Sequence, residues 1–295
     1  MMKKSCICWL FALCCLSVFG QNDSLALANA MWQIDTIQGL VLKQVHFTHH
    51  EYFQSNQNIC VLEIPAQSTY QLKYAYEPKR TRTSVMAQKQ DAIAAINGSF
   101  FDMQAHNPIC YLRIDNEEVG INTPGKDTVN RKYYQYGTLV LANRQEHPEM
   151  LARIVQTDSN RFWERLLPDA NIMTAGPLLI FQGNRMPMRN DLSFVHDRHN
   201  RTAVGILADG TVLFVTIDGR TRESAGMSLD ELISTLHWLG CQNALNMDGG
   251  GSTTLYIKGK TSKGIVNYPT DNGLFDHAGE RAVSNAILVV PITDN

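Results

Sequence analysis

The stretch RTAVGILADGTVLFVTIDGR, residues 201–220, contains two apolar runs that are rich in β-branched side chains. Between the runs stand Asp209 and Gly210, the dipeptide that best fits a two-residue hairpin turn. The sequence therefore predicts two antiparallel strands, one over residues 202–208 and one over residues 211–218.

A helix is predicted directly after this hairpin, within TRESAGMSLDELISTLHWLGCQ at residues 221–242. Ser228 and Glu231 have the spacing of a capping box at a helix start. Leucine and isoleucine then recur at helical spacing, and Gly240 stands where a helix commonly ends. The pattern indicates a helix with one buried face.

The strands expected on either side of this helix both end in an aspartate. Asp218 ends the strand before it, and Asp248 ends a strand expected over residues 244–248. Strand-helix-strand units join parallel strands, so both carboxylates are expected at one edge of the sheet. Ligands of open α/β sheets bind at that edge, but an Asp-Gly pair is also typical of a structural turn. Both interpretations stay open for each aspartate.

Three consecutive glycines, Gly249, Gly250 and Gly251, follow Asp248. Each glycine costs the folded chain backbone entropy, so a run of three needs a reason. Glycine lets the main chain approach a ligand closely, and consecutive N–H groups can face an anion. The run therefore favours a binding role for this segment.

Six ordered motifs together resemble the phosphodiester glycosidase family. They are AINGSFFD (95–102), TAGPLLIFQG (174–183), RTAVG (201–205), IDGR (217–220), LNMDGGGSTT (245–254) and ERAVSNAI (280–287). The best-known member of that family removes N-acetylglucosamine from a phosphodiester on mannose. The resemblance covers about residues 90–290 and implies a secreted bacterial hydrolase that cleaves a sugar from a sugar-1-phosphodiester.

The expected fold class is α+β, with a mixed β-sheet core flanked by helices and a strand-helix-strand crossover at residues 211–248. Residues 31–76 are β-rich, and a short helix over residues 82–90 is expected to be capped by Thr83 or Ser84. No linker rich in proline, serine or charge divides the chain, so one domain is expected.

The first twenty residues predict a secretory signal peptide, because two lysines precede an apolar run too short to span a membrane. Cleavage near Gly20 would leave a mature domain over residues 21–295, in the periplasm or outside the cell. Lipid anchoring is less favoured, because neither Cys14 nor Cys15 follows the small residue that lipidation normally requires.

Composition excludes several other classes. The formal net charge is −2 and no basic stripe is present, which argues against nucleic acid as a partner. Cys60, Cys110 and Cys241 are the cysteines that follow the predicted signal peptide, and three thiols do not make a disulfide scaffold. The absence of a Cys-x-x-Cys pair excludes a zinc ribbon.

The resemblance implies roles for particular residues. Asp248, Asp218 and Glu280 are the candidate catalytic carboxylates, and Arg201, Arg220 and Arg281 are the candidate phosphate-binding cations. Further candidate substrate-binding residues are Asn97, Ser99, Thr174, Gly176, Thr202, Asn246, Gly249, Gly250, Gly251, Ser252 and Thr253. The partner is a phosphodiester-linked glycan, with no metal site assigned and no cofactor required.

Two alternative functions remain open from the sequence. Asp218, Asp248 and Asn97 at one sheet edge could bind a divalent cation such as Ca²⁺ or Mg²⁺ through oxygen, and the metal would promote attack of water at phosphorus. That arrangement would make a metal-dependent phosphodiesterase. The other alternative is a carbohydrate-binding protein without catalysis.

Overall fold

The computed structural model describes residues 22–123, 137–156, 162–189 and 191–292. The predicted signal peptide at residues 1–20 lies outside this range. No helix among the described residues is long and apolar enough to span a membrane.

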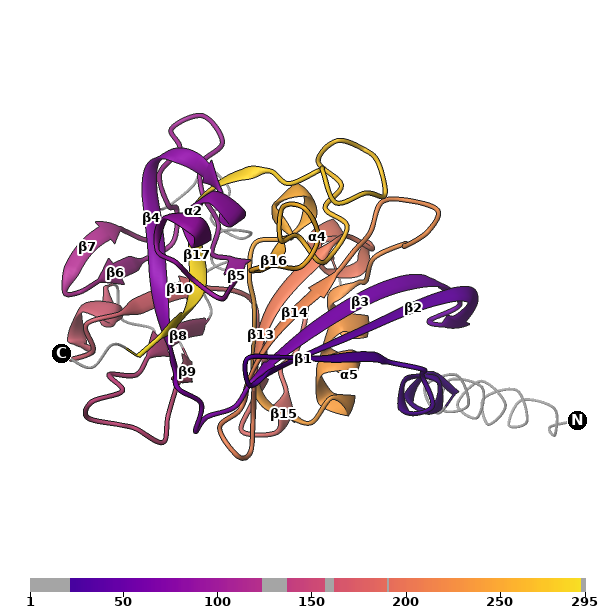
Figure 1. Cartoon of the computed structure of the whole chain (residues 1–295), viewed down its shortest axis with the longest axis horizontal. Coiled ribbons are helices and arrows are strands. Elements are labelled where there is room, and N and C mark those ends of the chain that lie inside the picture. The colour runs from indigo at the N-terminus through magenta and orange to yellow at the C-terminus, as the bar shows by residue number, and fades with distance from the viewer. Residues whose placement is uncertain (1–21, 124–136, 157–161, 190, 293–295) are drawn as a thin grey trace, which may run out of the picture.

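Three β-sheets make up the frame of the described residues (Figure 1). The first sheet has the order β1 (Gln33–Ile37), β2 (Leu40–Tyr52), β3 (Ser55–Ile64), β14 (Val212–Ile217), β13 (Arg201–Leu207), β15 (Cys241–Asn246), β11 (Leu178–Phe181) and β12 (Asn184–Arg185). The second has the order β7 (Glu117–Gly120), β6 (Leu112–Ile114), β10 (Ile172–Ala175), β8 (Gly137–Leu141) and β9 (Ala152–Gln156). The third has the order β16 (Leu255–Ile257), β5 (Ala94–Asn97), β17 (Ala282–Pro291) and β4 (Tyr70–Arg82).

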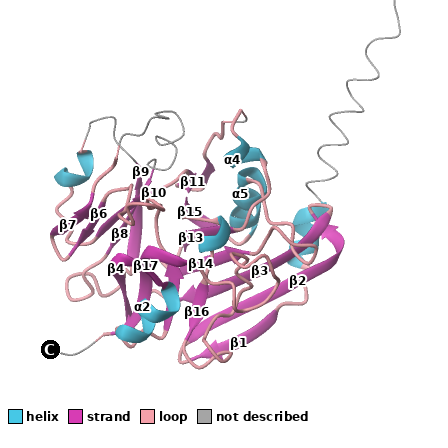
Figure 2. Ribbon diagram, turned by 90° about the horizontal axis from the view of Figure 1, so that it is seen from above, coloured by secondary structure: helices cyan, strands magenta, loops and turns pink. Residues whose placement is uncertain are grey.

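The helices are few and short. They comprise residues 22–28, α2 (Thr83–Lys89), α4 (Ser193–His196) and α5 (Leu229–Trp238), with 3-10 turns η1 (Trp163–Leu166) and η2 (Gly250–Ser252). Figure 2 shows α4 and α5 on one side of the first sheet and α2 beside the third. The expected α+β class with helices flanking a sheet core is confirmed.

The predicted hairpin and crossover are both present. β13 and β14 pair antiparallel, and the loop between them at residues 208–211 is longer than the two-residue turn that the sequence predicted. β13 also pairs antiparallel with β15, so β14 and β15 run parallel to each other with β13 between them. Strand β15 ends at Asn246, two residues earlier than predicted.

The helix of the crossover, α5, begins as its sequence predicts. The Ser228 hydroxyl accepts a hydrogen bond from the Glu231 N–H at 3.2 Å, and the Glu231 carboxylate accepts one from the Ser228 N–H at 2.9 Å. Gly240, with φ of +90°, follows the last turn in the left-handed conformation. The buried face of α5 packs its leucines on the first sheet.

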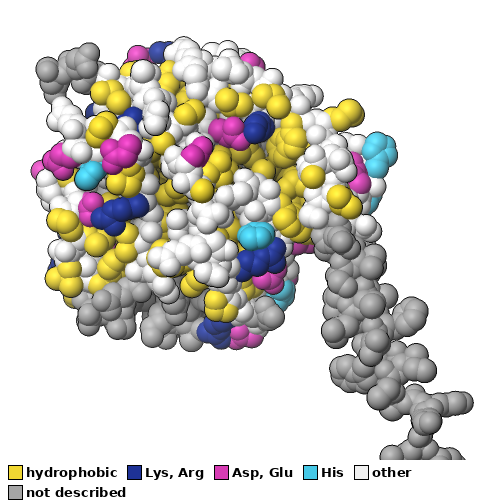
Figure 3. Space-filling view, turned by 90° about the horizontal axis from the view of Figure 1, so that it is seen from below, with side chains coloured by type: hydrophobic (Ala, Val, Ile, Leu, Met, Phe, Trp, Pro, Cys, Tyr) yellow, Lys and Arg dark blue, Asp and Glu magenta, His cyan; other side chains and the backbone are white. Residues whose placement is uncertain are grey.

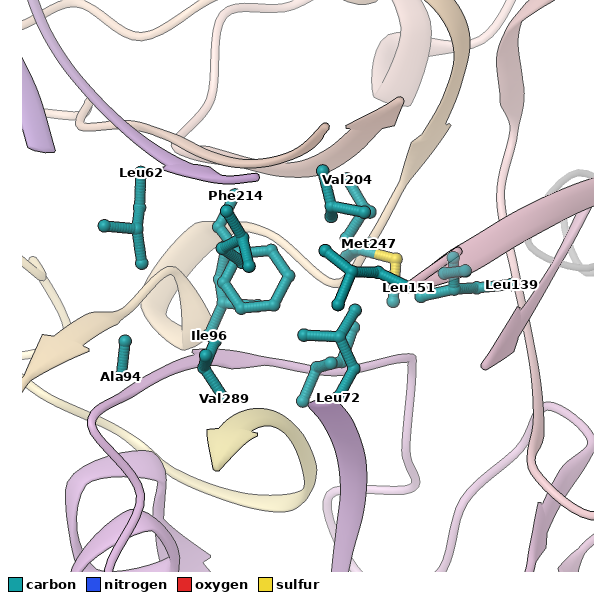
Figure 4. Packing of buried hydrophobic residues seen from close by; sticks show 14 of the residues in the cluster. Leu62, Leu72, Ala94, Ile96, Leu139, Leu151, Val204, Phe214, Met247 and Val289 are labelled. Atoms are coloured by element: carbon teal, nitrogen blue, oxygen red, sulfur yellow. The ribbon is translucent and has the colours of Figure 1, made fainter. Parts of the chain in front are cut away.

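The largest apolar core lies where the three sheets face one another. Figure 4 shows Leu62 and Phe214 of the first sheet opposite Ile96 and Val289 of the third, with Leu139 of the second beside them. The opposite face of the first sheet is covered by α4, α5 and residues 22–28. Because both of its faces are buried, β14 is buried along its whole length.

The surface and the cysteines agree with a globular protein that has no disulfide scaffold. Acidic and basic side chains are interspersed with apolar ones on the face shown in Figure 3. Cys60, Cys110 and Cys241 are all free and buried, as expected for core-filling thiols.

Candidate functional site

The crossover brings both predicted aspartates to one edge of the first sheet. Arg201 pairs with Ile217 at the start of β13, and Asn246 pairs with Ala203, so β14 and β15 end where β13 begins. Asp218 directly follows the end of β14, and Asp248 lies two residues after the end of β15. One strand, β13, lies between the ends of β14 and β15.

Asp248 is partly exposed and its main chain is fixed by the third sheet. Its N–H donates to the Gly98 carbonyl at 3.1 Å, and its carbonyl accepts from the Asn97 side-chain amide at 2.7 Å. Burial raises the pKa of the Asp248 carboxyl to about 6, and the nearby groups of Ser252, Arg281 and Arg220 oppose this rise. The Asp248 carboxyl therefore loses its proton closer to neutral pH than an ordinary aspartate does.

The glycine run after Asp248 makes room for two arginines. A Cβ atom on Gly250 would lie 3.1 Å from Arg220 Nη2, and one on Gly251 would lie 2.5 Å from Arg281 Nη2. A Cβ atom on Gly249 would lie 2.6 Å from the carbonyl oxygen of Asn200. A side chain at Gly250 or Gly251 would crowd a guanidinium group, and one at Gly249 would meet the main chain of Asn200.

Arg220 and Arg281 differ in how they are held. Arg281 pairs with Asp271, with Nη2 and Oδ1 2.5 Å apart. Arg220 is exposed, and its Nη2 lies 3.4 Å from His199 Nδ1. Both cations lie close enough to Asp248 to favour its ionised form. Together they form a positive pair beside one carboxylate.

Arg201, the third predicted cation, does not face this site. Its side chain is 2% exposed and donates to the carbonyls of Met227, Phe194 and Asp197 at 2.8 to 2.9 Å. The guanidinium also lies over the Phe194 ring at 5.2 Å. These contacts direct the guanidinium toward main-chain carbonyls at residues 194, 197 and 227, and phosphate binding by Arg201 stays a prediction.

Asp218 is fully buried and acts as a junction between segments. Its two carboxylate oxygens accept hydrogen bonds from Asn58 Nδ2 at 2.8 Å, Asn267 Nδ2 at 2.8 Å and the Tyr268 N–H at 2.9 Å. Burial raises the pKa of the Asp218 carboxyl, and these hydrogen bonds oppose the rise. The geometry suits an anchor that joins β3 and the 267–268 loop to β14.

Glu280 lies against the start of α2. Its carboxylate accepts from the Ser84 N–H at 2.8 Å and from the Ser84 hydroxyl at 2.6 Å. Burial raises the pKa of the Glu280 carboxyl, while these bonds lower it. No side chain of α2 itself makes the capping bond, so the predicted cap by Thr83 or Ser84 is wrong and Glu280 takes that place.

Both polar atoms of the Asn97 side chain form hydrogen bonds with the protein. Its Oδ1 accepts from the Thr202 hydroxyl at 2.9 Å and from the Thr254 N–H at 3.0 Å, while Nδ2 donates to Asp248. The Thr202 hydroxyl also lies 3.2 Å from that of Thr253. Asn97, Thr202 and Thr253 thus form a buried brace behind Asp248.

Several other predicted residues lie close to this brace and keep unused polar atoms. The Asn246 amide donates to the Gly176 carbonyl at 2.8 Å, while its Oδ1 is buried without a hydrogen-bond partner among the described residues. The buried hydroxyl of Ser99 likewise meets no partner in hydrogen-bond geometry in that part of the chain, and the buried Ser252 hydroxyl has only the nearby Asp248 carboxylate. The Thr174 hydroxyl instead lies 3.0 Å from that of Thr138.

The three residues proposed for a divalent cation do not form one set of available ligands. Asp218 and Asn97 use their oxygens in the bonds described above, and only Asp248 is partly exposed. Among the described residues, no group of three or more His, Cys, Asp or Glu side chains could hold a metal ion. This donor set does not fit the hard-cation site considered from the sequence.

Sequence reasoning missed several residues that shape the site. His199 and Asp271 contact Arg220 and Arg281, and Asn58 and Asn267 hold Asp218. Asn285 Oδ1 accepts from the Ser99 N–H at 2.7 Å. No local pattern marks these side chains, although the ERAVSNAI motif contains Asn285.

Comparison with protein families gives one match over most of the chain. The model for the phosphodiester glycosidase family matches residues 90–290. This span contains all of the predicted site residues.

Two curated relatives share the same level of identity. A SPbeta prophage-derived uncharacterized protein of Bacillus subtilis (strain 168), YomE, is 28% identical over 208 residues, 63% of this chain and 30% of that protein. The N-acetylglucosamine-1-phosphodiester alpha-N-acetylglucosaminidase of mouse is 28% identical over 180 residues, 60% of this chain and 33% of that enzyme. The matched part is about a third of the length of these relatives.

Among solved structures, the catalytic domain of the zebrafish enzyme of that name, auto-inhibited by its pro-peptide, is similar. The TM-score is 0.63 at 16% identity, and the match covers 92% of each chain. The two proteins therefore share a fold.

Proposed function

Since this chain belongs to the phosphodiester glycosidase family, we propose that it is a hydrolase that releases a sugar from a sugar-1-phosphodiester. The observation that carries the proposal is the partly exposed Asp248 carboxylate with the guanidinium groups of Arg220 and Arg281 close by. The guanidinium groups match the negative charge of a phosphodiester. The carboxylate matches the positive charge that develops on the anomeric carbon as its bond to oxygen breaks.

The reaction consumes one water and breaks the bond between the anomeric carbon and the bridging oxygen. The sugar gains a hydroxyl group, and the oxygen leaves with the phosphate monoester. A monoester has a second pKa of roughly 6, so it departs readily without a strong general acid. One well-placed carboxylate and a cationic phosphate site are then the main requirements.

Asp248 is the proposed reacting carboxylate, either as base toward water or as nucleophile toward the anomeric carbon. The anomeric configuration of the first-formed product separates these two roles. Arg220 and Arg281 bind the phosphate oxygens, because the planar guanidinium group suits two of them at once. Asp218 and Glu280 are proposed as positioning residues, since both carboxylates are buried and hydrogen-bonded.

The sugar is proposed to bind at the unused polar atoms beside Asp248. Ser99 and Asn246 offer such atoms, and the Ser252 hydroxyl lies near the Asp248 carboxylate. N-acetylglucosamine is the first sugar to test, because the mouse relative is named for it.

The protein is further proposed to act outside the cytoplasm, in the periplasm or medium, after cleavage of the predicted signal peptide. Cell fractionation together with N-terminal sequencing of the purified protein tests this location. A mature chain that begins near Gln21 is the expected result, and a cytoplasmic protein that retains Met1 contradicts it.

Hydrolysis of N-acetylglucosamine-phosphate-methylmannoside in ¹⁸O-labelled water, followed by mass spectrometry, tests the proposed reaction. Label in the free sugar is expected, because water attacks carbon. Label in the phosphate would mean attack at phosphorus and would replace this proposal with the phosphodiesterase alternative. Tight binding without turnover would instead indicate a carbohydrate-binding protein.

A further inference from the structure

Arg220 contacts a histidine at the site, whereas Arg281 contacts a carboxylate. Arg220 Nη2 lies 3.4 Å from His199 Nδ1. A guanidinium group has donors and no acceptor, so the contact is attractive only when His199 Nδ1 carries no proton. The geometry therefore assigns His199 its neutral form, with the proton on Nε2.

His199 is presented by a rigid piece of main chain. Its N–H and carbonyl both bond to Met227, at 3.2 and 3.0 Å. Gly226 makes this pairing feasible, because a Cβ atom there would lie 2.4 Å from the His199 carbonyl oxygen. Gly226 also has φ of +82°, which disfavours any other residue. The imidazole is thus fixed by two segments and does not belong to a free loop.

The fixed position of His199 matters for the orientation of the Arg220 side chain. It is exposed and has φ of +64°, an uncommon conformation for a residue with a side chain. Unlike Arg281, it forms no ion pair with a carboxylate among the described residues. A long arginine side chain loses rotamer freedom when it is held in one orientation. A neutral acceptor orients the guanidinium without neutralising its charge, which leaves the full charge for an anionic ligand.

We propose that His199 is a positioning residue that aims Arg220 at the substrate phosphate, and that it does so only while it is neutral. This inference rests on the function proposed above. Protonated His199 would place a second cation 3.4 Å from Arg220 and turn the arginine away. Affinity for phosphodiesters then falls in acid through His199 itself, independently of Asp248.

The surroundings of His199 agree with this role. Arg220 and Arg201 face it as cations, and Asp197 is the opposing anion. Burial first, and then these two arginines, lower the pKa of His199 below its ordinary value, so the neutral form prevails at neutral pH.

Binding to an Asp248→Asn background tests the proposal, because this background cannot titrate at position 248. The probe is N-acetylglucosamine-phosphate-methylmannoside, whose diester keeps one negative charge between about pH 8 and pH 5. We expect His199→Ala to lower affinity, measured by calorimetry, about tenfold already at pH 8, and the affinity of the parent to fall toward that of the alanine variant as the pH is lowered through this range.

His199→Asn supplies the sharper comparison, because the asparagine Oδ1 can replace Nδ1 as acceptor but does not titrate. In the same background this variant should bind as tightly as its parent at pH 8 and lose no affinity at pH 5. The matched control is His196→Asn, since His196 is an exposed histidine of the same segment that pairs with Asp197. It should follow the parent at both pH values.

A second readout does not depend on turnover or on ligand. Nitrogen-15 NMR of the wild-type protein should show His199 with an unprotonated Nδ1. A proton on Nδ1 would overturn the role of His199 and leave the proposed function standing, as would unchanged binding by the His199→Ala variant. No binding of the diester by any variant would overturn both proposals.

Discussion

The side-chain amide of Asn97 donates a 2.7 Å hydrogen bond to the main-chain carbonyl of Asp248, from a strand that belongs to a different sheet. At its other end the same amide accepts from Thr202 and from the Thr254 N–H. One buried side chain therefore fixes the point at which β15 leaves the sheet. The position of the Asp248 carboxylate depends on this brace.

Replacing Asn97 by Asp should damage both stability and turnover. The new oxygen would face the Asp248 carbonyl with no proton to share, so two acceptors would repel each other. We expect a loss of about 1–3 kcal/mol in the free energy of unfolding, measured in urea. Asn107→Asp, on an exposed loop, is the matched control, and equal effects of the two variants would rule out the brace.

Replacing Asp248 by Asn should lower kcat about a thousandfold, as expected for loss of a reacting carboxylate. The variant should also be more stable than wild type at pH 8, by about 3 kcal/mol, because the folded pKa of about 6 exceeds the ordinary value of 3.8. The ionised carboxylate is thus destabilising above the folded pKa. The difference should vanish below about pH 3, where the carboxyl is protonated in both the folded and the unfolded state. Unfolding curves at the two pH values check this, and an unfolded variant would return Asp248 to a structural role.

The pH dependence of wild-type kcat/KM should follow the Asp248 carboxyl. Its pKa of about 6 means that the reactive ionised form is lost as the pH falls through that value. We expect the rate to drop about tenfold for each pH unit below it. A profile that stays flat down to about pH 4.5 would exclude Asp248 as the group that must be ionised.

Arg220 and Arg201 should separate by phenotype. Arg220→Ala should raise KM about tenfold with little change in stability, because its guanidinium is exposed beside the glycine run. Arg201→Ala should instead cost about 3 kcal/mol of stability, since three carbonyls lose their donor. Kinetics and urea unfolding on both variants check the contrast, and the reverse pattern would refute the assignment of phosphate binding to Arg220.

The Glu280→Gln variant tests whether Glu280 only caps α2 or also takes part in catalysis. The glutamine carbonyl can still accept from the Ser84 N–H, and its amide can donate to the Ser84 hydroxyl, so stability should fall by less than about 1 kcal/mol. Activity should stay within about twofold of wild type. A loss of several hundredfold in a folded variant would restore Glu280 as a catalytic carboxylate.

Local signals account for what the sequence predicted correctly. The capping box at Ser228 and the apolar runs around Asp209-Gly210 involve neighbours in the chain, and the structure confirms the helix and the hairpin. The common edge of Asp218 and Asp248 follows from the handedness and parallel strands of the crossover. These features need no knowledge of distant contacts.

The remaining features depend on contacts between distant segments. Arg201 and Arg220 look alike in the sequence, yet only the α4 carbonyls decide that Arg201 is buried. Glu280 caps a helix that lies 196 residues earlier, and Asp218 meets Asn58 across 160 residues. No periodicity or spacing carries such information. The three-sheet arrangement likewise rests on pairings such as β4 with β17.

Strand β17 lies between β5 and β4, although it follows them by about two hundred residues in the chain. Until Ala282–Pro291 has left the ribosome, β4 and β5 lack their common partner, and the Asn285 contact to Ser99 cannot form. A partly synthesised chain therefore cannot close the third sheet. The protein therefore completes its fold, and with it any hydrolytic site, only after the residues of β17 have been synthesised.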